Sequence, residues 1–126
     1  MGYRSQVVLA ISKHLTPFLM LATAKNKEAE ALVFKYADNF DRDYEGDKSW
    51  LLVWDSIKWY DAYEDIGTLC KFIDEAVCDE YEFEVDGKPQ SSAEHIRFVR
   101  VGEESGDIEM LGDGFWDIYT HTNICY

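Results

Sequence analysis

The chain has 126 residues, of which 47% are hydrophobic and 15% aromatic, and its formal net charge is −13. This length and hydrophobic content are typical of one domain that buries its own core, so we expect a single domain spanning residues 1–126. The negative charge argues against direct binding to nucleic acid or to an anionic membrane, and it favours association with basic partners.

The charge is concentrated in the later part of the chain, because residues 1–37 carry a net charge of +3 and residues 38–126 carry −16. An alternative explanation for this acidity is solubility alone.

The three cysteines are not closely spaced, which fits a reducing compartment. The apolar stretch at residues 7–11 is too short to span a membrane, and no signal-peptide pattern is present, so we expect a cytosolic protein.

The first part of the chain predicts a strand followed by two helices. Residues 3–11 include a β-branched, apolar run with the length of a central strand. Thr16 and Pro17 are a helix-start signal and predict a short helix over residues 17–24. A second helix follows, with one apolar face made of Ala29, Leu32, Val33, Tyr36, Ala37 and Phe40.

The middle of the chain predicts a loop and then a bent strand. Residues 41–48 are polar and contain a glycine, which indicates a loop. Residues 50–54 are apolar on both faces, so we expect a strand that is covered on both sides. Beyond Asp55 the residues alternate, with Ile57 and Trp59 on one face, and we expect a bulge or a bend at Asp55-Ser56.

The last part of the chain predicts one helix and several strands. A helix over residues 63–77 should pack on the sheet through Ile66, Leu69, Cys70, Ile73 and Val77. Strands are expected at residues 81–85, 96–101, 107–111 and 116–126, with turns at residues 86–87 and 112–114. This order predicts an α+β fold, a mostly antiparallel sheet with about three helices packed on one face.

One polar stretch resembles the opening of a calcium-binding EF-hand loop. Asp41, Asp43 and Glu45 alternate before Gly46, so their oxygens could converge on a cation. That loop also needs a glutamate at its twelfth position, where this chain has Leu52. We therefore expect a solvated acidic loop here, with weak metal binding as the alternative.

Zinc ligands and catalytic groups are present but not grouped. The histidines and cysteines lack the close pairs of a zinc site, although His121 and Cys125 could share a strand face. Cys70 and Cys78 lie on or just after the apolar side of a helix, where burial would raise the pKa of a thiol and suppress its reactivity. No phosphate-binding glycine motif occurs. We expect no catalytic residue, no metal ion and no cofactor, and therefore a binding protein rather than an enzyme.

A row of acidic residues is a stronger signal for binding. Glu80, Glu82, Glu84 and Asp86 alternate with apolar residues, so in a strand their carboxylates lie on one face at intervals of about 6.7 Å. DNA presents one phosphate per roughly 3.4 Å of axis along each strand, so this row could mimic DNA. The alternative is an edge strand whose charged face prevents aggregation.

Aromatic residues are numerous for so small a domain, and such residues are enriched at the centres of protein interfaces. If the alternation beyond Asp55 is correct, Tyr60 and either Trp54 or Trp59 could remain partly exposed as anchors. The partner-binding residues that we expect are Glu80, Glu82, Glu84, Asp86, Glu103, Glu104, Trp59 and Tyr60.

Four segments resemble a family of small tailed-bacteriophage proteins. They are Met-Gly-Tyr-Arg-Ser-x-Val at residues 1–7, Val-Trp-Asp-Ser-Ile-Lys-Trp-Tyr at 53–60, Arg-Phe-Val-Arg-Val-Gly-Glu-Glu at 97–104, and Asp-Ile-Glu followed by Gly-Asp-Gly-Phe at 107–115. The chain departs from the family at residues 79–94, which are longer and more acidic, and at residues 122–126. The resemblance implies a phage accessory protein, made in the host bacterial cytoplasm, that modifies host processes or blunts host defence, and it implies no catalytic residues.

Small acidic phage proteins of this kind include anti-CRISPR proteins and inhibitors of restriction enzymes. By analogy, the first hypothesis is an inhibitor or adaptor that binds a basic or nucleic-acid-binding host protein, without touching nucleic acid or membrane itself. The second hypothesis is a small-molecule or nucleotide-binding protein with a pocket beside Trp54, Tyr60 and Arg97 or Arg100. A third is a structural component of the virion.

Overall fold

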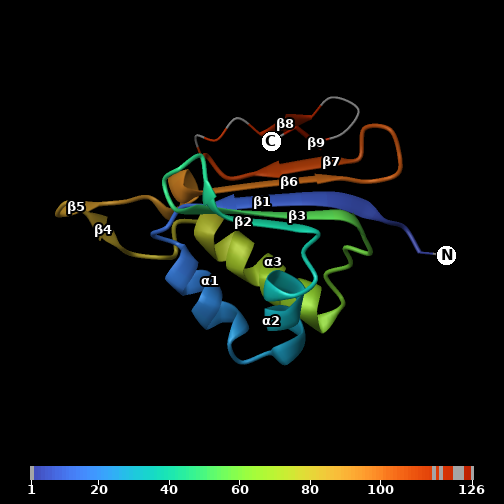
Figure 1. Cartoon of the computed structure of the whole chain (residues 1–126), viewed down its shortest axis with the longest axis horizontal. Helices are drawn as coiled ribbons and strands as arrows, with labels where there is room; N and C mark the ends of the chain where they lie inside the picture. The colour runs from blue at the N-terminus through green and yellow to red at the C-terminus, as the bar shows by residue number, and fades with distance from the viewer. Residues whose placement is uncertain (1, 115, 117, 121–123, 126) are drawn as a thin grey trace.

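The computed structural model describes residues 2–114, 116, 118–120 and 124–125. Within them, five strands form an antiparallel sheet in the order β2-β3-β1-β6-β7, and α-helices cover one face of it (Figure 1). The strands are β1 (Ser5–Ile11), β2 (Asn39–Tyr44), β3 (Ser49–Ile57), β6 (Ile96–Val101) and β7 (Ile108–Leu111), and the helices are α1 (Thr16–Thr23), α2 (Lys27–Phe34) and α3 (Glu64–Val77). The predicted α+β fold is confirmed. No helix in the described part of the chain is long and apolar enough to cross a membrane.

Strand β1 lies at the centre of the sheet and is buried on both faces. Val7, Leu9 and Ile11 belong to the core between the sheet and the helices. Val8 and Ala10 belong to a second core on the opposite face. All five side chains are fully buried, which confirms the predicted central strand.

Strand β3 contains the predicted bulge. Its Trp54 pairs with Val7 and its Ile57 pairs with Ser5, so β3 has one residue more than β1 between these two pairs. The extra residue falls at Asp55-Ser56, where both side chains are exposed. A bulge bends its strand and increases the local twist. Beyond it, Ile57 and Trp59 pack against the core on the helical face, as the alternation predicted.

Helix α3 provides most of the helical cover. It buries one face, made of Ile66, Leu69, Phe72, Ile73 and Ala76, in the core between the sheet and the helices. Cys70 and Val77 lie at the margins of this face and are half-buried. Cys78 is exposed, so its predicted burial is wrong. The helix ends at Val77, and Asp79 then turns the chain with a φ of 59°.

Residues 39–44 form strand β2, so the predicted extension of the second helix to Phe40 and the predicted loop from residue 41 are both wrong. Helix α2 already ends at Phe34, and the Phe40 ring instead packs against Phe34 and Trp50, at centroid distances of 5.9 and 5.2 Å. The rest of β2 is exposed except for Tyr44. A charged outer strand of this kind protects a sheet edge from pairing with other chains.

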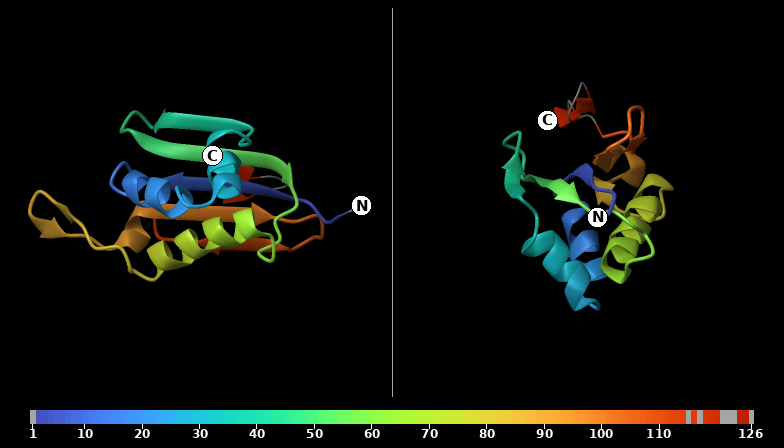
Figure 2. Two further views of the ribbon diagram at one scale, coloured as in Figure 1. Left: turned by 90° about the horizontal axis from the view of Figure 1, so that it is seen from below. Right: turned by 90° about the vertical axis from the view of Figure 1, so that its right-hand side faces the viewer.

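The carboxyl-terminal segment covers the face of the sheet opposite the helices (Figure 2). The chain reaches it through Gly112, whose φ is +89° and where an added Cβ would lie 2.1 Å from the Ile96 carbonyl oxygen. Within the described residues, strands β8 (Tyr119–Thr120) and β9 (Ile124–Cys125) pair only with each other. The predicted single last strand over residues 116–126 is therefore wrong, since the segment packs on the sheet instead of extending it.

A hairpin arm projects from one end of the sheet (Figures 1 and 2). It comprises residues 79–91, with strands β4 (Glu84–Val85) and β5 (Lys88–Pro89) joined by the predicted turn at Asp86-Gly87, where both φ angles are positive. The predicted strand over residues 81–85 is regular only at Glu84–Val85. A 3₁₀ turn, Ser92–His95, connects the arm to β6.

We expect Trp116→Ala to lower the free energy of unfolding by about 3 to 5 kcal/mol, as for other large-to-small changes in a core. Trp116 is 5% exposed and packs in the second core, which it shares with Val8 and Val99. Chemical denaturation followed by circular dichroism measures the effect. Tyr36→Ala, at a side chain 61% exposed, is the control and should cost less than about 0.5 kcal/mol. If Trp116→Ala also cost less than about 0.5 kcal/mol, this would contradict the role of the carboxyl-terminal segment in stabilising the sheet.

We also expect stability to fall as the pH is lowered from about 7 towards 5, through His95. Its Nδ1 lies 2.8 Å from Ser12 Oγ and its Nε2 lies 3.1 Å from Gln90 Oε1. Burial lowers the pKa of His95, and the charge of His14 acts in the same direction. The unfolded chain therefore takes up this proton near a pH of about 6.5, before the folded chain does. Denaturation midpoints across this range should vary less in His95→Gln, and identical profiles would refute the linkage.

Candidate functional site

Two candidate surfaces lie at opposite ends of the sheet. The arm is at one end, and the loop between β6 and β7, which contains Glu103 and Glu104, is at the other (Figures 1 and 2). Trp59 and Tyr60 line a pocket that also includes Asp107, from the end of that loop. The structure therefore separates the predicted partner-binding residues into an arm set and a pocket set.

The arm presents its carboxylates outward. Glu80, Glu82, Glu84 and Asp86 are exposed, whereas the intervening residues 81, 83 and 85 are half-buried, so the predicted alternation of faces is confirmed. Among the described residues, no lysine or arginine forms an ion pair with any of these four carboxylates. The row is therefore available to an external partner.

Aromatic packing fixes the inner side of the arm. The Tyr81 ring lies 4.8 Å from the Phe18 ring of α1, centroid to centroid. The Phe83 ring lies 4.9 Å from His95 and stacks on His14 at 5.9 Å. These contacts hold the arm against the helical layer and leave the acidic side in water.

Asp79 closes the base of the arm. Its carboxylate accepts hydrogen bonds from the Ser91 hydroxyl and, at 3.0 Å, from the Ala93 backbone N–H. These two hydrogen bonds hold the pKa of the Asp79 carboxyl below its ordinary value, and the bond from Ser91 has the larger effect. The charged form is therefore the one that ties the two ends of the arm together.

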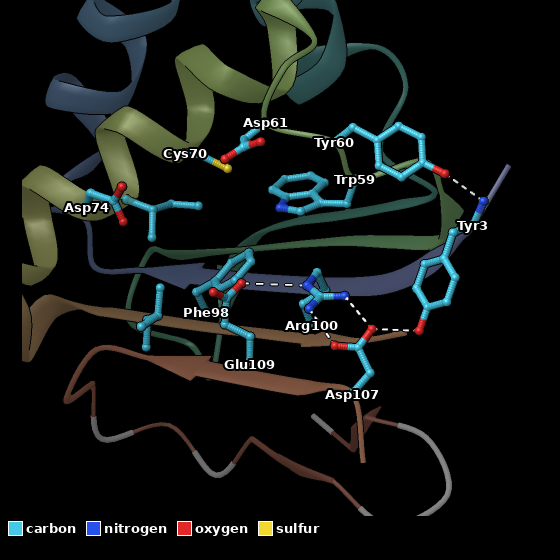
Figure 3. A pocket seen from close by; sticks show the side chains of 12 residues that line it. Tyr3, Trp59, Tyr60, Asp61, Cys70, Asp74, Phe98, Arg100, Asp107 and Glu109 are labelled. Carbon is cyan, nitrogen blue, oxygen red and sulfur yellow. Dashed lines mark hydrogen bonds and ion pairs between the residues drawn. The ribbon is translucent and has the colours of Figure 1, made fainter. Parts of the chain in front are cut away.

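The second surface is a half-open pocket of about 450 Å³ between α3 and strands β6 and β7 (Figure 3). We call it the aromatic–acidic pocket. Its apolar lining consists of Tyr3, Trp59, Tyr60, Ile73, Phe98 and Leu111. Its polar lining consists of Asp61, Cys70, Asp74, Arg100, Asp107 and Glu109.

Arg100 is held by carboxylates of the neighbouring strand. Its guanidinium donates hydrogen bonds of 2.8 and 3.2 Å to the two carboxylate oxygens of Asp107, and its Nε lies 3.6 Å from Glu109 Oε1. It also donates to Ser5 Oγ at 3.2 Å. The hydrogen bond to Asp107 is the largest cause of the raised pKa of Arg100. This guanidinium is therefore already neutralised within the fold.

Tyr3 ties the amino-terminal segment to the same network. Its hydroxyl donates to Asp107 Oδ2 at 2.6 Å and accepts from the Glu104 N–H at 2.8 Å. Its backbone N–H donates to the Tyr60 hydroxyl oxygen at 2.6 Å. Burial, followed by the hydrogen bond to Asp107, raises the pKa of Tyr3. One side of the pocket is thus built from three distant parts of the chain.

Cys70 lies at the inner side of the pocket as a neutral thiol. Burial raises its pKa to about 11, and the nearby carboxylates of Asp74, Asp61 and Glu109 act in the same direction. A thiol with this pKa is almost wholly protonated at neutral pH and is a poor nucleophile. The predicted suppression of its reactivity by burial therefore agrees with its environment.

A pocket lined by aromatic residues and an arginine is present, but not all of the residues predicted for it line it. Tyr60 and Arg100 line it, but Trp54 is only 2% exposed and donates from its indole N–H to the Leu32 carbonyl at 3.1 Å. Arg97 instead donates to the Gly112 carbonyl at 3.0 Å. The sequence reasoning missed Tyr3, Asp61, Asp74, Asp107 and Glu109 as lining residues.

Metal ligands do not converge in the described part of the chain, where no group of three or more histidine, cysteine, aspartate or glutamate side chains could hold a cation. Asp41 and Asp43 lie on β2, and Asp43 lies 3.8 Å from Lys48 Nζ. The possible pairing of His121 with Cys125 involves side chains outside the described residues.

Comparison with known proteins finds no matching family model, no matching curated protein and no matching solved structure. The function of the chain is therefore inferred from its own residues and their geometry.

We expect Asp107→Asn to reduce the acid sensitivity of the fold. Hydrogen bonds from Arg100, and then from Tyr3, hold the pKa of Asp107 below its ordinary value. Its stabilising contribution is therefore complete above a pH of about 4 and is lost as the pH falls further. Unfolding measured from about pH 5 to pH 2 should show a smaller loss of stability in Asp107→Asn than in wild type.

Asp61→Asn is the matched control, because no hydrogen bond or ion pair within the described residues engages that carboxylate. Because it breaks none of the hydrogen bonds of this network, it should leave the free energy of unfolding close to the wild-type value. Equal acid profiles for Asp107→Asn and wild type would show that the network does not stabilise the fold.

Proposed function

We propose that this protein is a bacteriophage accessory protein that binds a basic, nucleic-acid-binding host protein through its acidic arm and inhibits it. The observation that carries the proposal is the outward row of Glu80, Glu82, Glu84 and Asp86, whose carboxylates have no cationic partner among the described residues. A DNA-binding cleft is lined with lysine and arginine that pair with phosphates. An anchored acidic row would compete for those side chains.

The arm has the form that such competition requires. It projects from the end of the sheet, so it could enter a concave site that the body of the protein could not (Figure 1). Its base is fixed by Asp79 and by the packing of Tyr81 and Phe83, so little conformational freedom need be lost on binding. Five of the eight residues 79–86 are acidic, which would accelerate encounter with a basic surface.

The resemblance to small phage proteins supports the same proposal. The arm, residues 79–91, lies within residues 79–94, where we expect this sequence to be longer and more acidic than that family. An insertion that carries the charge is a reasonable place for a member to have acquired its own partner. In this proposal the protein acts in the cytoplasm of the host bacterium, where the proteins of host defence are found.

The test compares two charge reversals at opposite ends of the molecule. Immobilised wild type, Glu82→Lys/Glu84→Lys and Glu103→Lys/Glu104→Lys are each incubated with host lysate at low and at moderate salt, and retained proteins are identified. Both variants change the net charge by the same amount. We expect wild type and the loop variant to retain a nucleic-acid-binding protein that the arm variant loses, and we expect salt to weaken the association.

The retained protein is then purified, and its binding to duplex DNA is measured with increasing amounts of each form. Inhibition by wild type, and inhibition at least about tenfold weaker with the arm variant, would support the proposal. Equal inhibition by wild type and the arm variant would refute the role of the arm. Retention that moderate salt leaves unchanged would refute the electrostatic mechanism.

A further inference from the structure

The aromatic–acidic pocket contains more negative than positive charge. Asp61, Asp74, Asp107 and Glu109 line it, and among the described lining residues the one cation is Arg100. Because Arg100 is engaged by Asp107 at 2.8 and 3.2 Å and approached by Glu109 at 3.6 Å, it offers no free positive charge to a ligand. A phosphate group would therefore meet carboxylates without a compensating arginine, which disfavours a nucleotide as the occupant.

Two of the carboxylates are available to a ligand. Within the described residues, the side chains of Asp61 and Asp74 take part in no hydrogen bond and no ion pair. They lie on the α3 side of the pocket, facing the side that holds Arg100 (Figure 3). Lys71, on the same helix, lies 4.0 Å from Glu75 instead. These oxygens can accept hydrogen bonds from a positively charged group.

Aromatic rings form the wall between the two groups of carboxylates. The Trp59 ring packs on Phe98 at 5.8 Å, centroid to centroid, and Tyr60 lies beside it in the pocket lining. A cation placed over the face of a tryptophan is attracted by the ring quadrupole, by about 0.5 to 2 kcal/mol depending on its desolvation. The same ring offers apolar surface to the alkyl part of such a ligand.

The state of Cys70 supports a negative potential inside the pocket. After burial, the largest causes of its raised pKa are the carboxylates of Asp74, Asp61 and Glu109. Groups that oppose the formation of a thiolate at this position favour the presence of a cation there.

We propose that the aromatic–acidic pocket binds an organic cation, a guanidinium or alkylated ammonium group, with its charge at Asp61 and Asp74 and its apolar part against Trp59. The volume of about 450 Å³ lies within the usual range of about 300 to 1,000 Å³ for small-molecule sites. The cation is either a free small molecule or a basic side chain of a protein partner. Asp61 and Asp74 lie outside the arm, residues 79–91, and this proposal does not depend on the function proposed for the arm.

Tryptophan fluorescence and calorimetric titrations with four probes test the proposal. Agmatine represents the free cation, and a capped Gly-Arg-Gly peptide represents the side chain of a partner. The same peptide with citrulline in place of arginine is the neutral analogue, and AMP is the anion. We expect saturable binding of at least one cationic probe and no binding of the citrulline peptide or AMP. Binding of agmatine alone would identify a free small molecule, and preference for the arginine peptide would identify a partner's side chain.

Matched variants locate the site. Asp61→Asn/Asp74→Asn should weaken binding of the cation by about tenfold or more, since it removes the two unpaired charges while keeping their shape. Trp59→Leu should weaken it as well. Glu82→Gln/Glu84→Gln removes the same charge from the arm and should bind like wild type. Thermal unfolding of each variant verifies that it is folded.

Three results would overturn the proposal. The first is equal affinity for the arginine and citrulline peptides, and the second is unchanged binding by a folded Asp61→Asn/Asp74→Asn variant. The third is the absence of binding by both cationic probes at millimolar concentration. Since the arm variant is tested separately with the host partner, failure here would leave the proposed function of the arm standing.

Discussion

The burial of β1 on both faces is the constraint on which the rest of the fold depends. The apolar side chains of Val7 to Ile11 alternate between the two faces of β1, so each face needs a cover that removes apolar surface from water. The three helices supply one cover, and the carboxyl-terminal segment with Trp116, Ile118 and Ile124 supplies the other. The sheet is therefore the middle layer of the molecule, and the arm and the loop between β6 and β7 extend from its two ends.

The two candidate surfaces arise at those ends by different means. At one end, the chain leaves α3 at Asp79 and forms the arm before it enters β6. At the other end, the bulge in β3 and the connection to α3 bring Trp59, Tyr60 and Asp61 beside β6 and β7. The Arg100 and Asp107 pair fixes that wall, and the close approach of Tyr3 there requires Gly102, where an added Cβ would lie 2.3 Å from the Tyr3 hydroxyl.

Local periodicity predicted those elements whose buried face appears in the sequence as a regular spacing of apolar residues. The apolar face of α3 and the strand-like run of β1 are continuous patterns, and the change to alternation at Asp55 is visible as a change of period. Strand β2 was missed because its inward-facing residues are few and the rest is charged. The carboxyl-terminal cover was missed because its packing is decided by the unsatisfied face of the sheet, which no local pattern reveals.

The arm was predictable and the pocket was predictable only in part. The alternation of acidic and apolar residues at 80–86 appears directly in their burial. The pocket collects residues from distant segments, and no spacing relates Tyr3 to Asp61. One signal was available: in a hairpin of the two predicted strands, Arg100 stands opposite Glu109, and Asp107 lies on the same face as Glu109. The pairing of Arg100 with acidic residues could have been inferred from that register.

The position of β1 in the chain also has a consequence for synthesis. The strand is made before either of its partners, since β3 is complete only at Ile57 and β6 only at Val101. While the ribosome extends the chain, the most apolar segment of the protein therefore waits without its neighbours, and its contacts have a large sequence separation, which slows folding. The negative charge of residues 38–126 adds repulsion between copies of the chain only after β1 has been made and has begun to fold.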